Sequence, residues 1–102
     1  MSVKNLTSKS FDEFVKGGKS VIDFYADWCN PCKILSPIVE ELSGKLKDMK
    51  FGKVDVDKED KLAQRFQIMS VPSLLFFKSG EQVDRVVGVL SKEELIKRIK
   101  KI

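Results

Sequence analysis

The clearest pattern in the chain is a nearly continuous apolar run from Ser20 to Ala26, in which polar and apolar residues do not alternate. A short run of this kind, rich in β-branched and aromatic side chains, is typical of a strand covered on both faces. From there to about Lys47, apolar residues recur every three or four positions and form one helix face: Ile34, Leu35, Ile38, Val39, Leu42 and Leu46. The pattern predicts a buried strand followed by a long amphipathic helix, which Pro37 kinks but does not end.

Shorter segments on either side have patterns of their own. Strands are predicted at residues 3–6, 51–57, 71–77 and 82–87, and helices at residues 10–15, 60–66 and 92–102. Ser8 or Ser10 is expected to cap the first helix, and Ser91 with Glu94 matches the capping box of the last one. Ser79-Gly80 joins the last two strands in a hairpin.

The predicted order of elements is β-α-β-α-β-α-β-β-α. Helical crossovers make the early strands parallel, whereas the late hairpin must be antiparallel. We therefore predict an α/β fold with a mixed central sheet of about five strands, flanked by about four helices. The 102 residues fit one domain, spanning 1–102, with no repeat and no linker.

Charge adds little to this picture. The chain has 19 basic and 15 acidic residues, a net charge of +4, and the segment from Lys92 to Ile102 supplies much of the excess. Basic residues in the last turns of a helix complement its negative end, so we interpret this segment as a solvated helix and expect no nucleic-acid or membrane partner. The segment from Met1 to Phe14 lacks the apolar run of a signal peptide, and a cytoplasmic location is expected.

The only two cysteines, Cys29 and Cys32, lie two residues apart at the start of the long helix. A Cys-x-x-Cys pair serves metal binding, redox chemistry or neither. The chain has no histidine, which argues against a zinc site within one chain and against nucleophiles activated by imidazole. A metal or cluster shared between two chains stays open as a minor alternative. The acidic segment from Asp55 to Glu59 lacks the glycine and glutamate of a calcium loop, and no phosphate loop is present.

Redox chemistry suits this spacing, because two residues between cysteines in the first turn of a helix bring both sulfurs to bonding distance. Pro31 is favoured in that turn. Cys29 would lie at the helix N-terminus, where free N–H groups and the helix dipole favour a thiolate by as much as ~2 kcal/mol. Cys32, one turn inward, is expected to be more shielded and to stay protonated until it is needed.

Asp23 is the second informative residue, since it interrupts a strand that we expect to be covered on both faces. Burial without a fixed partner raises the pKa of a carboxyl group, so Asp23 is a candidate to take the proton of Cys32. The alternative is a carboxylate that hydrogen bonds satisfy at the end of the sheet.

These residues resemble the thioredoxin family over the chain from about residue 3 to the end. The motif Trp28-Cys-Asn-Pro-Cys-Lys33, preceded by Asp23-Phe-Tyr-Ala26, carries the resemblance. Matches elsewhere support it: Pro37, Lys53-Val-Asp-Val-Asp57, Val71-Pro72-Ser73, Phe77-Lys-Ser-Gly-Glu81 and Val87-Gly88. The resemblance implies the thioredoxin fold, with Cys29 as the exposed nucleophile, Cys32 as the resolving thiol and Asp23 as the buried acid-base group.

The resemblance also implies roles around the cysteines. Lys53 would tune Asp23, and Trp28 would pack beside the site with Asp57 as a candidate partner of its indole N–H. Val71-Pro72 would be a cis peptide whose Val71 backbone pairs with an extended substrate, and Gly88 would flank the same groove. Ordinary structural roles stay open for four of these residues: packing for Trp28, a solvated charge for Lys53, an edge proline for Pro72 and a turn or bulge for Gly88.

One position departs from the family pattern, because Asn30 replaces the usual glycine between Cys29 and the proline. Asparagine restricts the backbone and adds a side chain that forms hydrogen bonds, so we expect Asn30 to alter the relative stability of dithiol and disulfide. The sign of this redox tuning does not follow from the sequence.

The leading hypothesis is a monomeric protein-disulfide reductase, without a bound cofactor or metal, that a separate thioredoxin reductase recycles. Its substrates would be proteins that contain disulfides. Two alternatives stay open. The same chemistry can run in another direction, as in a disulfide oxidase, an isomerase or a glutaredoxin-like protein. Otherwise the fold serves as a binding scaffold whose thiols are incidental.

Overall fold

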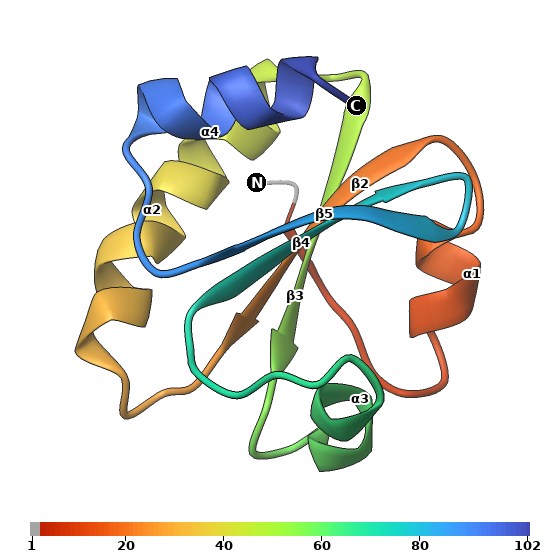
Figure 1. Cartoon of the computed structure of the whole chain (residues 1–102), viewed down its shortest axis with the longest axis vertical. Coiled ribbons are helices and arrows are strands. Elements are labelled where there is room, and N and C mark those ends of the chain that lie inside the picture. Colours follow the sequence, from red (N-terminus) through yellow and green to blue (C-terminus); the bar gives the residue numbers. More distant parts are fainter. Residues whose placement is uncertain (1–2) are drawn as a thin grey trace.

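The computed structural model describes residues 3–102, so Met1 and Ser2 of the expected 1–102 domain lie outside the described residues. Five strands form one sheet in the order β1-β3-β2-β4-β5 (Figure 1). The strands are β1 (Val3–Asn5), β2 (Lys19–Tyr25), β3 (Met49–Asp55), β4 (Ser73–Lys78) and β5 (Glu81–Val87). β3 is parallel to both β1 and β2, whereas β4 is antiparallel to its neighbours β2 and β5. The predicted mixed sheet with a late antiparallel hairpin is confirmed.

Within residues 3–102 four helices cover the sheet, and Figure 1 shows α2 and α4 together on one side. They are α1 (Phe11–Val15), α2 (Asn30–Lys45), α3 (Asp60–Arg65) and α4 (Lys92–Lys100). One buried cluster joins α1 and α3 to Ile22 and Phe24, and a second joins α2 and α4 to Val21. Adjacent residues of β2 thus face opposite cores, which explains why its sequence is apolar without alternation.

The element boundaries differ from the predicted ones by a few residues. Pro72 lies just before β4 rather than inside it, and β4 begins at Ser73. α2 continues through Pro37, as predicted. Ser91 and Glu94 form the complete predicted capping box at the start of α4. Ser10 is the N-cap residue of α1 but makes no side-chain capping bond there.

The connection from β2 to α2 positions the two cysteines. β2 ends at Tyr25 and α2 begins at Asn30, so the motif lies at the carboxyl ends of the parallel strands. This edge is where α/β folds place ligands and reacting groups, because the connecting loops gather there. No helix within residues 3–102 is long and apolar enough to cross a membrane.

Gly52, in the middle of β3, allows a test of how β3 packs between β1 and β2. A Cβ atom added there would lie 2.7 Å from Leu6 Cδ1 and 3.2 Å from Ile22 Cδ1. We expect Gly52→Ala to lower the free energy of unfolding by about 1–3 kcal/mol, because the core side chains must move apart.

Gly44→Ala is the matched control, since nothing lies within 4 Å of a Cβ atom at that position in α2. Alanine is a better helix former than glycine, so this variant should be as stable as the parent or up to about 1 kcal/mol more stable. Urea unfolding measures both. Equal stability of the two variants would contradict the packing described for β3.

Candidate active site

Cys29 and Cys32 form a disulfide bond, with their Cα atoms 5.3 Å apart. Cys29 is the N-cap residue of α2, and its Sγ atom accepts a hydrogen bond of 3.2 Å from the Cys32 backbone N–H. Pro31 lies in the first turn of the helix, where its missing N–H leaves no bond unmade. The predicted position of Cys29 at a helix N-terminus is therefore confirmed, and the Cys32 N–H of this turn bonds its sulfur.

The two cysteines do not differ in exposure as expected. Cys29 is 4% exposed and Cys32 is 3% exposed, so both are buried in the disulfide form. The expectation of an exposed Cys29 is wrong for this form, because the Val71 segment covers it: Cys29 Sγ lies 3.6 Å from the Val71 carbonyl oxygen. The two sulfur atoms differ instead in their surroundings. Cys29 contacts this segment, whereas Cys32 lines a cavity behind the pair.

The segment beside Cys29 is fixed by three features. The Val71–Pro72 peptide bond is cis, as the family resemblance implied. The Gly88 N–H donates to the Pro72 carbonyl oxygen at 2.9 Å, which ties the end of β5 to this segment. Gly88 has φ +103°, a conformation that side chains disfavour, although a Cβ atom there would contact nothing within 4 Å. Its backbone conformation, not a lack of space, is what requires glycine.

Trp28 lies at the surface immediately before the cysteines and is 69% exposed. Its indole N–H donates to Asp57 at 2.8 Å, so the expected partner is confirmed. Together with Met69 and Val71 it lines an open groove of about 390 Å³. Met69 is 92% exposed and was not singled out from the sequence. Exposed tryptophan and methionine side chains beside a reactive pair form an apolar contact surface.

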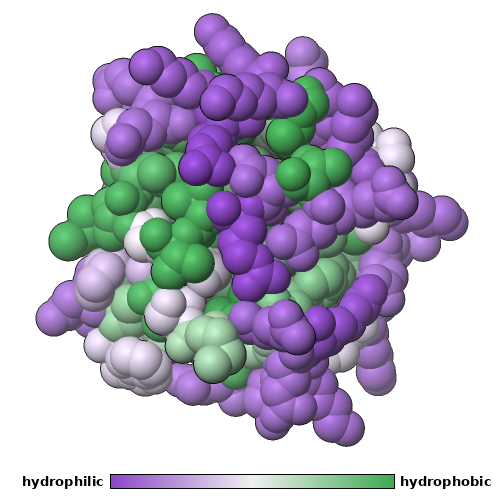
Figure 2. All heavy atoms as spheres, in the orientation of Figure 1, coloured by the Kyte–Doolittle hydropathy of each residue, from purple (hydrophilic) through white to green (hydrophobic). Residues whose placement is uncertain are grey.

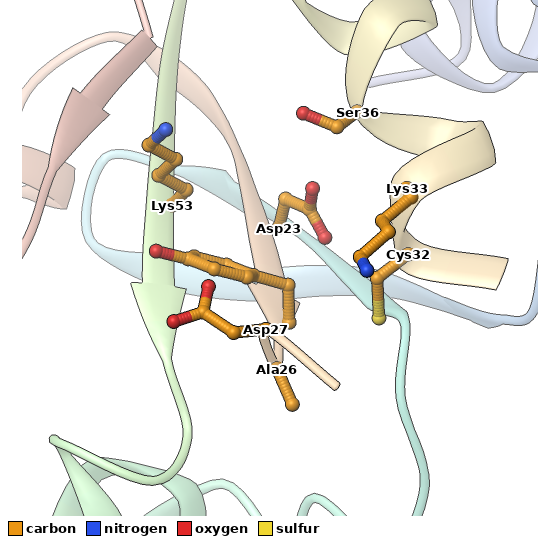
Figure 3. A pocket seen from close by; sticks show the side chains of 8 residues that line it. Asp23, Ala26, Asp27, Cys32, Lys33, Ser36 and Lys53 are labelled. Carbon is orange, nitrogen blue, oxygen red and sulfur yellow. The ribbon is translucent and has the colours of Figure 1, made fainter. Parts of the chain in front are cut away.

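Asp23 lies behind the cysteines, where it lines a cavity of about 240 Å³ together with Cys32 and Lys53 (Figure 3). It is 3% exposed, so the prediction of burial is confirmed. Its Oδ1 atom has no hydrogen-bond partner among the described residues. This oxygen therefore gives no support to the alternative, in which hydrogen bonds stabilise the ionised Asp23 carboxylate.

Desolvation raises the pKa of Asp23 from its ordinary value to about 7, and the positive charge of Lys53 acts in the opposite direction. Lys53 is the direct neighbour of Asp23 in the register of β2 and β3. The two side chains form no ion pair within 4.0 Å, and the Lys53 ammonium group instead lies 5.8 Å from the centre of the Tyr25 ring. Lys53 acts on Asp23 at a distance, through its field.

Five further residues line this cavity that were not predicted as site residues: Tyr25, Ala26, Asp27, Lys33 and Ser36. Ser36 follows Cys32 by four positions, and the helix period alone places both side chains on one face of α2. Figure 3 shows Ser36 on the same helix as Cys32 and Lys33, across the cavity from Lys53. Burial and the nearby negative charges of Asp55, Asp27 and Asp23 raise the pKa of Tyr25.

Asn30 is exposed at the start of α2, and no hydrogen bond from its side chain to another described residue is present. It lies between the two cysteines, directly after Cys29 and before Pro31, and its effect on the disulfide stays a prediction. Within residues 3–102, no three histidine, cysteine, aspartate or glutamate side chains are grouped so that they could hold a metal ion.

A thioredoxin family model matches residues 2–101 of the chain. A thioredoxin from Chlamydia pneumoniae is 41% identical over 99 residues, which cover 97% of each chain. A thioredoxin from Staphylococcus saprophyticus is 43% identical over 103 residues, covering 99% of this chain and 98% of its own.

Solved structures agree with these relatives. A thioredoxin from Malassezia sympodialis, Mala s 13, superposes with a TM-score of 0.90 at 36% identity, covering 98% of this chain and 90% of its own. A mutant thioredoxin from Halobacterium salinarum superposes with a TM-score of 0.92 at 34% identity, covering 98% of this chain and 89% of its own. The similarity therefore extends over nearly the whole of each protein.

The raised pKa of Asp23 predicts how stability depends on pH. Between about pH 4 and 7 the folded protein keeps this proton while the unfolded chain loses it, so the free energy of unfolding falls as the pH rises. The fall amounts to at most about 4 kcal/mol, at about 1.4 kcal/mol per pH unit, and ends above pH 7. Asp23→Asn should abolish this fall in stability and be more stable than the parent protein at pH 8.

Urea unfolding of the disulfide form between pH 4 and 8 measures the effect. Asp48→Asn is the control, because Asp48 is exposed and its loss should leave the pH dependence of the parent. If Asp23→Asn retained the same fall in stability, Asp23 would not be the group that titrates.

Proposed function

The chain belongs to the thioredoxin family, and from that premise we propose which residues carry its reaction and in what order. It is a thiol-disulfide oxidoreductase that reduces protein disulfides. Nothing in the comparisons favours the oxidase, isomerase or scaffold alternatives. The observation that carries the proposed mechanism is the arrangement of the pair: Cys29 caps a helix, and Cys32 lines a cavity with Asp23.

The first step begins with the dithiol form, in which Cys29 is the nucleophile. N–H groups of the first turn of α2 stabilise its thiolate, as the bond from Cys32 N–H to Cys29 Sγ indicates. The thiolate attacks one sulfur of the substrate disulfide. A mixed disulfide forms between Cys29 and the substrate, the substrate S–S bond breaks, and the second substrate sulfur leaves as a thiolate that takes a proton from water.

The second step needs a thiolate at Cys32, and Asp23 is the proposed base. Asp23 and Cys32 line the same cavity, and a carboxyl group with a pKa of about 7 accepts or releases a proton near neutral pH. The Cys32 proton passes to ionised Asp23, directly or through water in the cavity. The Cys32 thiolate then attacks Cys29 Sγ, the mixed disulfide breaks, and the reduced substrate leaves from a newly formed Cys29–Cys32 disulfide.

Lys53 is proposed to keep the pKa of Asp23 in a range that is useful for proton transfer. Desolvation alone would hold the Asp23 carboxyl group protonated to still higher pH, and the positive charge of Lys53 opposes this. A base that titrates near the working pH combines a sufficient ionised fraction with sufficient proton affinity.

The substrate-binding surface is proposed to consist of Trp28, Pro31, Val71, Pro72 and Gly88. Val71 and Trp28 line the surface groove, and the hydrogen bond from Gly88 N–H holds Pro72 in place beside it. An extended substrate segment would pair with the backbone of Val71, since strand-like pairing recognises main chains of any sequence. Asn30 is proposed to tune the redox potential from its exposed position between Cys29 and Pro31.

Recycling requires electrons from outside, because the reaction leaves this chain oxidised. We propose a separate thioredoxin reductase as their source and proteins with accessible disulfides as their destination, so that this chain acts as an electron carrier. A cytoplasmic monomer folded as one domain over residues 1–102 fits the single sheet and the lone cysteine pair. The mechanism needs no bound cofactor or metal ion.

Replacement of Cys32 tests the order of the two steps. Cys32→Ser should still attack substrates but lack the thiol that releases them, so mixed disulfides at Cys29 should accumulate and insulin reduction should fall by at least a hundredfold. Non-reducing gels and mass spectrometry of the trapped peptides measure the accumulation.

Cys29→Ser is the matched control, since it keeps one thiol of the pair but removes the proposed nucleophile. It should trap little or nothing. Trapping through Cys32 in this variant, or full insulin reduction by Cys32→Ser, would refute the assigned order.

A further inference from the structure

Basic residues collect at the end of the sheet opposite the cysteines. Four short segments, 16–19, 45–50, 78–81 and 97–101, contain 10 of the 19 basic and 2 of the 15 acidic residues, a net charge of +8. The remainder of the chain has 9 basic and 13 acidic residues, a net charge of −4. The modest total charge of +4 therefore hides a strongly polarised molecule.

The fold brings these segments together. Lys19 at the start of β2 is the register partner of Met49 at the start of β3 and of Lys78 at the end of β4. The Ser79 N–H donates to the Gly18 carbonyl oxygen at 2.8 Å, which joins the β4–β5 turn to the start of β2. In Figure 1 the C-terminus and the beginning of β3 lie at this upper edge, and Figure 2 shows mainly hydrophilic side chains there.

A cavity of about 470 Å³ opens within this basic end. Four lysines line it, Lys19, Lys45, Lys47 and Lys100, together with a single acidic residue, Asp48. The other lining residues are apolar and buried or half-buried. The volume lies within the range of roughly 300–1,000 Å³ that is usual for small-molecule sites.

Groups within the protein balance part of the charge of this cavity. Lys45 pairs with Glu41 at 2.9 Å, but Lys19, Lys47 and Lys100 form no ion pair within 4.0 Å among residues 3–102. The C-terminal ends of α2 and α4 also lie here, and each adds a partial charge of about −0.5. Together with Asp48 and Glu41 these ends offset about three of the four lysines of the cavity, so its lining keeps an excess of about one positive charge, inside an end of the molecule whose four segments have a net charge of +8.

We propose that this lysine cavity binds an anion that carries two or more linked phosphate groups. A single carboxylate would not balance the net charge of +8 in the surrounding segments, and the described residues that line the cavity include no arginine to offer a carboxylate the paired N–H donors that it prefers. Lysine binds phosphate as a point charge, and several lysines around one cavity suit neighbouring phosphates. Among residues 3–102, no tryptophan, tyrosine or phenylalanine lines the cavity, so the bases of a single strand have no ring on which to stack, which argues against nucleic acid.

The site would operate independently of the cysteines. They lie at the carboxyl ends of β2 and β3, whereas the lysine cavity lies where both strands begin. A bound multi-phosphate ligand would therefore leave the redox face free for substrate.

Amide chemical shifts of the whole protein, followed during addition of inorganic triphosphate at low salt, test the proposal. We expect saturable shifts at Lys19, Lys47 to Met49 and Lys100, and affinity for triphosphate at least tenfold above that for orthophosphate. A variant with Lys19, Lys47 and Lys100 changed to Gln should bind triphosphate at least tenfold more weakly and reduce insulin at the parent rate.

The matched control changes Lys4, Lys9 and Lys61 to Gln, which removes the same charge from exposed positions elsewhere. It should lose no more than about threefold in affinity, as expected for a long-range charge effect alone. Equal losses of triphosphate affinity in the two variants, or no saturable binding of triphosphate, would overturn the proposal. Binding of oligothymidylate through these lysines, without binding of triphosphate, would also overturn it.

Vesicles of phosphatidylcholine with and without a phosphoinositide bisphosphate distinguish two sources of the ligand. Triphosphate binding accompanied by lysine-dependent vesicle binding assigns a lipid headgroup. Triphosphate binding without vesicle binding assigns a free multi-phosphate compound.

Discussion

The hydrogen bond from the Cys32 backbone N–H to Cys29 Sγ is the interaction on which the site depends. It exists because β2 ends at Tyr25 and α2 starts five residues later, so that Cys29 takes the N-cap position. A sulfur at an N-cap receives N–H groups that no helical carbonyl can satisfy. The same geometry that begins the helix therefore stabilises a thiolate, and the chain needs no histidine to activate it.

The second constraint is the central position of β2, with cores on both of its faces. Val21 packs under α2 and α4, and Ile22 and Phe24 pack under α1 and α3. A carboxyl group in such a strand has little access to water, which is why the pKa of Asp23 rises to about 7. One structural feature, a strand covered on both sides, thus provides the stability of the sheet and the unusual acidity of the carboxyl group buried within it.

Sequence patterns predicted the architecture well where local physics decides it. The unalternating run from Ser20 to Ala26, the capping box of Ser91 and Glu94, and the apolar face of the long helix all specify their elements directly. The cis bond before Pro72 came only from the family resemblance, because no local pattern distinguishes cis from trans there. The equal burial of the cysteines was missed, since the segment that covers Cys29 comes from Val71, 42 residues away. Helix periodicity could have predicted that Ser36 lies on the same face as Cys32. The exposure of Met69, in contrast, depends on a loop conformation that composition does not specify.

The central claim is that this arrangement makes the chain a reductant, and its redox potential tests that claim most directly. Equilibration of the Cys29–Cys32 pair with glutathione buffers, followed by the fluorescence of Trp28, gives the potential. We predict a redox potential near the value of about −270 mV that is typical of thioredoxins. Asn30 should shift this potential by no more than about 30 mV, which corresponds to roughly one hydrogen bond. A value at or above about −180 mV, in the range of disulfide isomerases and oxidases, would contradict this claim.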